Sequence, residues 1–283
     1  MSKIHFCTYG SLRFEYSRWR LAKEADDTGW FDHIHVYGKE HIGQFGRSVE
    51  GTGAGFWWWK SEIQKMTMDK MQDGDVMVYL DAGCYLNKAG EKEFKRYIDL
   101  ARANEMGAVF FNGSPESEKY YTKRDTLILI GCDDPSYIDS QQIASGLYIV
   151  VKNKNTIELV NNFVKASRID HLLNIDPSLN SEYPEFILHG SNHRHDQSVF
   201  SLTVKKLFND KNIDIITLDH TDHDDNIHRY HMEITSVEKY FAGVIDILTD
   251  IRFPIITARI DDTKLFSKIA TQDYIGKYEI KRS

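Results

Sequence analysis

The chain has 283 residues, of which 41% are hydrophobic and 27% are charged, and its formal net charge is -7. This composition excludes an intrinsically disordered chain and suits one large α/β domain with a hydrophobic core. The net negative charge argues against general nucleic-acid binding, although a local basic patch for a phosphorylated ligand stays open.

The N-terminus and the cysteines indicate a compartment. The opening segment MSKIHFCTYG lacks the apolar stretch of a signal peptide. No window of the sequence approaches the roughly 18 consecutive apolar residues that a membrane-spanning helix needs. We therefore expect no transmembrane segment and a cytoplasmic location. The three cysteines form no C-x-x-C pair, which predicts free thiols in a reducing compartment; they are Cys7, Cys84 and Cys132.

Short apolar runs alternate with helical patterns along the chain. In chain order, we predict a strand at 4–8, a helix at 16–28 that ends at Gly29, a strand at 33–37, a helix at 56–71 and a strand at 76–80. A helix at 91–104 and a strand at 108–111 follow, then an irregular stretch at 112–125 and an apolar run at 127–130. The last predicted elements are a strand at 146–151, helices at 156–169 and 196–208, and a late strand near Ile215. This alternation predicts βαβ units and an α/β fold with a mostly parallel sheet flanked by helices. Ligands of such sheets bind at the carboxyl ends of the strands.

The segment GDVMVYLDAGC contains the strongest local motif. Its apolar strand stops at Asp81, and Ala82 and Gly83 follow. Two small residues leave room for a ligand or a metal beside the carboxylate, and Mg²⁺ or Mn²⁺ prefers carboxylate oxygens. Asp81 therefore lies where open α/β sheets have their sites. The alternative is that Asp81 only stabilises the turn after the strand.

The segment GTGAGFWWWK, residues 51–60, combines glycines with three successive tryptophans. Glycines allow unusual backbone angles and close approach to a ligand. Three successive side chains cannot share one face of a helix, so at least one tryptophan reaches a pocket or the surface. Lys60 can balance a diphosphate. The alternative is core packing by two tryptophans beside a solvated lysine. The segment is neither a Walker A motif nor a dinucleotide fingerprint.

The segment HGSNHRHDQSVF gathers polar side chains around Asp196 and Gln197 at a predicted helix start. The alternative is a plain helix cap. Seven of the twelve histidines lie between His189 and His231. Histidine is the commonest side-chain metal ligand, so a zinc site stays open as an alternative, although no H-E-x-x-H is present. A nucleophilic hydrolase is disfavoured because the sequence has no G-x-S-x-G elbow.

The order of these motifs resembles the GT-A-fold glycosyltransferases of the small bacterial and viral kind. A strand with a Thr-Tyr-Gly loop, FWWWK, YLDAGC, SGLYIV and HRHDQSVF follow one another over roughly residues 1 to 230. The resemblance implies a Rossmann-like sheet that binds a nucleoside diphosphate sugar. It also implies a single catalytic domain over residues 1–283, with a C-terminal extension at roughly 231–283 packed on it.

The resemblance assigns roles to individual residues. Near the nucleotide and the donor sugar it implies Thr8, Tyr9, Gly10, Arg13, Trp59, Lys60, Asp81, Ala82, Gly83, Ser145, Gly146 and His195; near the anomeric carbon it implies Asp196 and Gln197. The family's Asp-x-Asp metal motif reads Asp-Ala-Gly here, so the second carboxylate is missing. We expect Asp81 to bind Mn²⁺ or Mg²⁺ together with His220 or His223.

Glycosyl transfer fits these residue types. The site must neutralise a leaving diphosphate and place a carboxylate near the positively charged sugar ring. Asp196 as a base predicts inversion, and Asp196 as a charge stabiliser predicts retention, which the Asp-Gln pair favours. We expect a hexosyl- or pentosyltransferase that moves a sugar from a UDP-sugar to a glycan or glycolipid acceptor, with no nucleic-acid partner. The alternatives are a metal-dependent nucleotidyltransferase or phosphohydrolase, and a non-catalytic module that binds sugar nucleotides.

Overall fold

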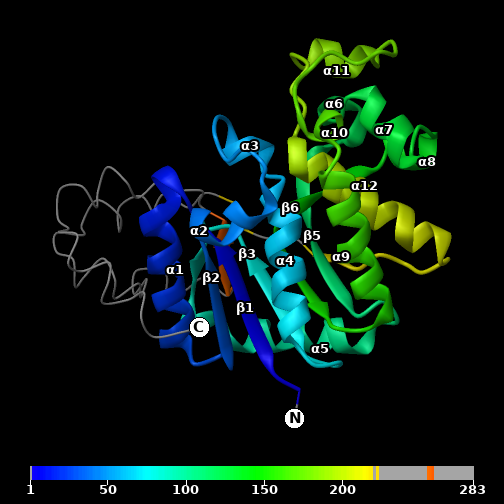
Figure 1. The fold of residues 1–283 in the computed structure, drawn as a ribbon. Coiled ribbons are helices and arrows are strands. Elements are labelled where there is room, and N and C mark those ends of the chain that lie inside the picture. Colours follow the sequence, from blue (N-terminus) through cyan, green and yellow to red (C-terminus); the bar gives the residue numbers. More distant parts are fainter. Residues whose placement is uncertain (1, 219–220, 223–253, 258–283) are drawn as a thin grey trace.

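A six-stranded sheet forms the centre of this computed structural model, which describes residues 2–218, 221–222 and 254–257. Figure 1 shows this sheet with helices packed against it. The strand order is β2-β1-β3-β6-β5-β7, and a three-stranded sheet has the order β4-β9-β8. The strands are β1 (Ile4–Tyr9), β2 (His33–Tyr37), β3 (Val76–Leu80), β4 (Tyr85–Leu86), β5 (Ala108–Ser117), β6 (Gln141–Val151), β7 (Thr217–Leu218), β8 (Thr221–Asp222) and β9 (Ile255–Thr257).

Helices connect and cover these strands. The longer ones are α1 (Glu15–Thr28), α4 (Trp59–Lys70), α5 (Glu91–Ala103), α9 (Lys154–Ser167) and α12 (His195–Asp210). The short ones are η1 (Leu12–Phe14), α2 (Lys39–Ile42), η2 (Gly43–Phe45), α3 (Gly53–Phe56), η3 (Lys88–Gly90), α6 (Glu118–Tyr121), α7 (Arg124–Ile130), α8 (Pro135–Ile138), α10 (Asp170–Leu173) and α11 (Pro184–Leu188). This architecture confirms the predicted α/β class with a sheet flanked by helices.

The sheet is mostly parallel, as predicted, with one reversed strand. β1 pairs in parallel with β2 and β3, and β5 pairs in parallel with β7. β6 runs antiparallel to both β3 and β5. Because Leu80 pairs with Leu147, the residues just before Leu147 lie beside the carboxyl end of β3. The reversed strand thus brings the middle of β6 to the edge where the predicted site lies.

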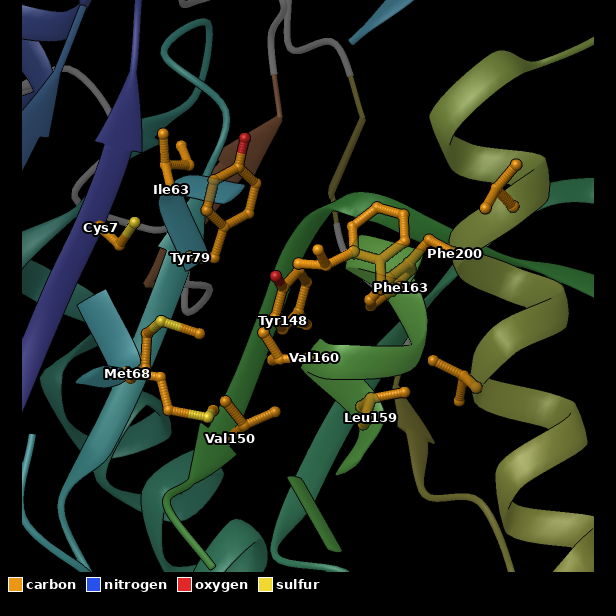
Figure 2. Close-up of a cluster of buried hydrophobic side chains, with 14 of the residues drawn as sticks. Cys7, Ile63, Met68, Tyr79, Tyr148, Val150, Leu159, Val160, Phe163 and Phe200 are labelled. Carbon is orange, nitrogen blue, oxygen red and sulfur yellow. The ribbon is translucent and has the colours of Figure 1, made fainter. Parts of the chain in front are cut away.

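Each face of the sheet is buried by its own layer of helices. On the face covered by α4, α9 and α12, alternate strand residues such as Cys7, Tyr79 and Tyr148 belong to one hydrophobic cluster with Phe163 and Phe200 (Figure 2). The Tyr148 and Phe200 rings are stacked with centroids 4.7 Å apart. The opposite face has a second cluster, which includes Phe6, Leu21, Val78, Ile98 and Ile149. Full burial on both faces explains why the central strands read as continuous apolar runs.

Most predicted elements are confirmed. The helices α1, α5, α9 and α12 begin and end within two residues of the predicted bounds. The strands β1, β2 and β3 also match their predicted runs. α1 ends where Gly29 adopts a left-handed conformation, with φ 71°.

Other predicted elements need correction. The helix predicted from residue 56 begins at Trp59, because Phe56 and Trp57 have positive φ angles. β5 continues to Ser117, through half of the stretch predicted to be irregular, and β6 begins at Gln141 rather than Gly146. The apolar run at 127–130 belongs to helix α7, and the late strand near Ile215 is reduced to Thr217–Leu218. Long-range pairing and packing decide these bounds, which local patterns do not specify.

Three further expectations concern the whole chain. The cysteines Cys7, Cys84 and Cys132 are buried free thiols, as predicted. Among the described helices, none combines the length and the apolarity needed to cross a membrane. The extension predicted at roughly 231–283 lies outside the described residues, apart from 254–257.

Candidate functional site

A buried charged cluster lies at the carboxyl end of β3. Lys60 Nζ is 2.6 Å from Asp196 Oδ2 and 3.1 Å from Asp81 Oδ1. The same ammonium donates to Ser145 Oγ at 3.2 Å, and the Ser145 hydroxyl donates to Asp196 Oδ2 at 2.7 Å. We call Lys60, Asp81, Ser145 and Asp196 the Lys60 cluster. The fold thus joins four predicted site residues from α4, the end of β3, β6 and the first turn of α12.

Asp81 is positioned by the neighbouring strand. Its backbone N–H donates to Gly146 O at 2.9 Å, and Tyr79 donates its hydroxyl to Asp81 Oδ1 at 2.7 Å. A Cβ atom on residue 146 would lie 2.7 Å from Asp81 Oδ2, so a side chain there would displace the Asp81 carboxylate from this position. The Asp81 side chain is 42% exposed, whereas that of Asp196 is 8% exposed. A ligand from solvent therefore meets the Asp81 carboxylate first.

The surroundings set the protonation of Lys60 and Tyr79. Burial alone would lower the pKa of the Lys60 ammonium, but Asp196 and Asp81 together outweigh burial and raise that pKa above its ordinary value. Burial, and then the Asp81 carboxylate, raise the pKa of Tyr79 well above its ordinary value. At neutral pH Lys60 is therefore a cation and Tyr79 a hydrogen-bond donor. The solvated lysine considered as an alternative is excluded, because Lys60 is 2% exposed.

The turn after Asp81 is fixed by a buried arginine of α1. Arg20 is fully buried and donates to two carbonyl oxygens of this turn, at 3.2 Å and 3.0 Å. Glu24 balances its charge at 2.7 Å. Ala82 and Gly83 are buried in the same turn. These two predicted ligand-binding residues therefore support Asp81 from within the protein.

Residues predicted to lie near a nucleotide gather at the end of β1. The Tyr9 ring stacks on the Trp59 ring, with centroids 3.8 Å apart. Gly10 N–H donates to the last carbonyl of β2 at 3.2 Å. Thr8 is fully buried, and its hydroxyl has no hydrogen-bond partner within the described part of the chain. Arg13 is exposed, and its guanidinium lies 5.1 Å from the centroid of a neighbouring aromatic ring.

Sequence reasoning missed Arg18, which the fold buries near the ends of β1 and β2. Arg18 is 3% exposed, and its guanidinium lies 3.3 Å from Glu40 and 3.6 Å from Glu15, two carboxylates that remain about half exposed. Its Nε has no hydrogen-bond partner among the described residues. Helical spacing offered a signal, because Arg18 shares the buried stripe of Leu21 and Ala25. A buried cation with one unused donor suits an anionic or polar ligand.

The three predicted site residues at the start of α12, which are His195, Asp196 and Gln197, make contacts with different parts of the protein. Asp196 joins the Lys60 cluster. His195 Nδ1 donates to Leu173 O at 2.6 Å. Gln197 Nε2 donates to Gln142 Oε1 at 2.7 Å, and Gln142 belongs to a separate buried hydrogen-bond network. The structure therefore unites Asp196, but not the Gln197 amide, with Asp81 and its neighbours.

The described side chains do not complete a metal site. Within residues 2–218, 221–222 and 254–257, no group of three or more His, Cys, Asp or Glu side chains is arranged to hold a metal ion. The Lys60 ammonium already lies beside Asp81, where it would repel a second cation. The predicted metal ligands His220 and His223 lie outside the described residues.

A left-handed turn precedes α4. Residues 53–57 all have positive φ angles, between 53° and 89°, and Ala54, Phe56 and Trp57 adopt them despite their side chains. The backbone N–H groups of Phe56 and Trp57 donate four residues back, at 2.7 Å and 3.1 Å, which closes the turn. A left-handed conformation costs about 1–2 kcal/mol for each residue with a side chain. Strain of this kind is typical of functional segments.

No protein-family model and no curated protein matches this sequence. Similar solved structures include a glycosyltransferase involved in the glycosylation of the major capsid of PBCV-1, at 14% identity over 90% of this chain and 93% of that chain, with a TM-score of 0.45. The apo WbbM bifunctional glycosyltransferase has 8% identity over 99% of this chain and a TM-score of 0.46. This chain spans 52% of that one.

A third similar structure is the bifunctional IspDF from Campylobacter jejuni. It has 9% identity over 77% of this chain and 50% of that chain, with a TM-score of 0.36. The likenesses are low in identity and in TM-score. The function is therefore inferred from the side chains around Lys60.

Proposed function

We propose that this protein is a GT-A-type glycosyltransferase that moves a sugar from a nucleoside diphosphate sugar, a UDP-sugar, to a glycan or glycolipid acceptor. One observation carries this proposal. At the carboxyl end of the central strand β3, a single buried ammonium is shared between a solvent-facing carboxylate and a buried one. Open α/β sheets bind their ligands at this edge.

The Lys60 cluster has the charges that glycosyl transfer needs. When the bond between the anomeric carbon and the diphosphate breaks, negative charge grows on the diphosphate and positive charge on the sugar ring. In the free protein the single positive charge of Lys60 is shared between Asp81 and Asp196. A diphosphate that attracts the ammonium releases Asp196 to face the sugar ring as an anion. Movement of the Lys60 ammonium toward the diphosphate would thus stabilise the leaving group and leave Asp196 beside the sugar ring.

The same contacts favour a charge-stabilising role for Asp196. Its Oδ2 atom is paired with an ammonium and accepts the Ser145 hydroxyl. Because the Ser145 hydroxyl donates to Asp196 Oδ2, that oxygen is already engaged, and we assign Asp196 the stabilisation of the positive sugar ring rather than the removal of a proton. We therefore propose retention of the anomeric configuration. The configuration of the first product in a time-resolved NMR spectrum tests this point.

The nucleoside is proposed to bind at the ends of β1 and β2. The stacked Tyr9 and Trp59 rings border this edge, and Arg18 Nε is an unused donor there. The diphosphate then extends from this edge toward Asp81. A divalent cation, Mn²⁺ or Mg²⁺, remains part of the proposal only if His220 or His223 completes the ligand set with Asp81.

A thermal-shift screen tests the proposal first. The probes are UDP, GDP, CMP and their common sugars, each with Mn²⁺, Mg²⁺ or a chelator. A ligand that binds only the native state raises the apparent stability. We expect a shift with UDP and slow hydrolysis of one UDP-sugar. Asp81→Asn should lose the hydrolysis, together with any part of the shift that depends on Mn²⁺ or Mg²⁺. Asp69→Asn is the matched control, since Asp69 pairs with Lys65 on the exposed face of α4.

The outcomes separate the alternatives. If no nucleotide sugar binds or is hydrolysed under any of these conditions, the glycosyltransferase proposal is wrong. Turnover of a sugar phosphate with a nucleoside triphosphate would favour the nucleotidyltransferase instead. Binding of UDP-sugars without turnover, unchanged in Asp196→Asn, would favour a non-catalytic binding module.

A further inference from the structure

Three rings meet from two distant segments, each of which adjoins a residue of the Lys60 cluster in the sequence. The Phe56 and His195 rings are stacked, with centroids 5.2 Å apart and planes inclined by 27°. The Trp57 and His195 rings have centroids 5.3 Å apart and planes inclined by 35°. Phe56 and Trp57 precede the helix that begins with Trp59 and Lys60, while His195 directly precedes Asp196. The rings therefore belong to residues that adjoin Lys60 and Asp196 in the sequence, at the starts of α4 and α12.

All three ring residues have strained backbones. Their φ angles are 59° at Phe56, 60° at Trp57 and 48° at His195, in the left-handed region that side chains disfavour. Phe56 and Trp57 pack on the hydrophobic core but remain partly exposed. Burial alone therefore does not compensate for the strain. Strain that meets at one point from two segments is typical of a ligand site.

The His195 ring also has a nitrogen atom, Nε2, that can bind a ligand. Its Nδ1 donates to Leu173 O at 2.6 Å, so in the neutral ring Nε2 carries the lone pair. This Nε2 atom has no hydrogen-bond partner among the described residues. The contact with Leu173 holds the ring in one orientation. His195 thus combines an aromatic contact surface with a fixed acceptor.

We infer that Phe56, Trp57 and His195 form a carbohydrate-binding subsite that holds a sugar ring of the acceptor next to Asp196. Sugars present apolar C–H faces that pack on aromatic rings, and hydroxyl groups that donate to an imidazole nitrogen. The donor's nucleoside and diphosphate have been assigned to the β1 end and to Asp81, which leaves the Asp196 side for the acceptor. The identification as an acceptor subsite rests on the proposed function; the binding of a sugar does not.

The test uses methyl glycosides of the common hexoses and N-acetylhexosamines as probes of the full chain. Saturation-transfer NMR measures their binding, and thermal shift with UDP measures the nucleotide site separately. The variants are Trp57→Asn and His195→Asn, because asparagine tolerates the left-handed conformation better than other side chains. In His195→Asn the side-chain amide can still donate to Leu173 O. Trp30→Leu is the control, since Trp30 is a partly exposed tryptophan stacked on Phe94 instead.

We expect at least one methyl glycoside to bind the wild-type protein, and each Asn variant to weaken that binding by about tenfold. Trp30→Leu should bind it as the wild type does. Loss in only one of the two variants would still support the subsite, provided that the folded variant keeps its UDP shift. If no glycoside binds, or if both folded variants bind as tightly as the wild type, the inference is overturned, whatever UDP does. An absent UDP shift with glycoside binding intact would instead contradict only the proposed function.

Discussion

The Lys60 ammonium lies 2.6 Å from the Asp196 carboxylate, deep under the more exposed Asp81. The two residues come from helices far apart in the sequence, and each is almost fully buried. A buried ion pair stabilises a protein little in net terms, because both charges lose their water. Its position at the end of β3, with Ser145 bridging the two partners, indicates a functional reason for burying charge here.

Lys60→Met should destabilise the protein by about 3–5 kcal/mol, because Asp196 would stay buried without its cation. The double variant Lys60→Met with Asp196→Asn should recover most of this loss, since neither charge remains. Chemical denaturation of the wild type, both single variants and the double variant measures the coupling. Additive effects of the two substitutions would show that the pair does not interact.

Asp81→Asn should change activity far more than stability. The Asp81 side chain is 42% exposed, so the loss of its charge should change the free energy of unfolding by at most about 1 kcal/mol. Donor turnover should fall by about a hundredfold or more, because a charge in the site is removed. Steady-state hydrolysis of the donor, beside a melting curve, checks both parts. Equal turnover in Asp81→Asn and wild type would show that the Asp81 carboxylate has no part in the reaction.

Acid should weaken the fold through the histidines of β1 and β2. Burial, and then the nearby His5, lower the pKa of His35 from 6.5 to about 3. The native state therefore binds fewer protons than the unfolded chain between these values, and stability falls as the pH drops from 6.5 toward 3. The buried His193, with its pKa also lowered to about 3, acts in the same direction.

His35→Gln should reduce this acid sensitivity, since glutamine takes up no proton. Melting temperatures between about pH 7.5 and about pH 4.5 measure the slope in the two proteins. His189→Gln, at an exposed position, serves as the control and should keep the wild-type slope. An identical slope in His35→Gln and wild type would contradict the assignment.

Gly55→Ala should destabilise the left-handed turn more than an ordinary glycine substitution does. Gly55 has φ 89°, and a Cβ atom there would lie 2.4 Å from Ser48 O, the acceptor of the Trp58 indole N–H. Gly74 has nearly the same φ, 88°, with open space around its Cβ position. Gly74→Ala should cost about 1–2 kcal/mol from backbone strain alone, and Gly55→Ala clearly more. If urea unfolding gives equal losses of free energy of unfolding for Gly55→Ala and Gly74→Ala, the turn accommodates the added Cβ atom and the prediction is wrong.

Local patterns in the sequence were enough to predict most of the strands of the central sheet and the longer helices that cover it. The five-residue apolar run before Asp81 predicted a buried strand with a carboxylate at its end, and the structure has both. These predictions succeed because apolar periodicity is a property of neighbouring residues. The residue types of the cluster, Lys60, Asp81, Ser145 and Asp196, were also selected from their motifs.

Only the tertiary structure decided how these residues meet. An apolar run carries no direction, so the reversal of β6, which brings Ser145 and Gly146 to Asp81, could not be read from it. Arg18, which the sequence analysis did not single out, is buried by the packing of α1. The left-handed conformation of Phe56 and Trp57 runs against their local preference, and both rings contact the distant His195. Local preference specifies the elements, whereas long-range packing assembles the site.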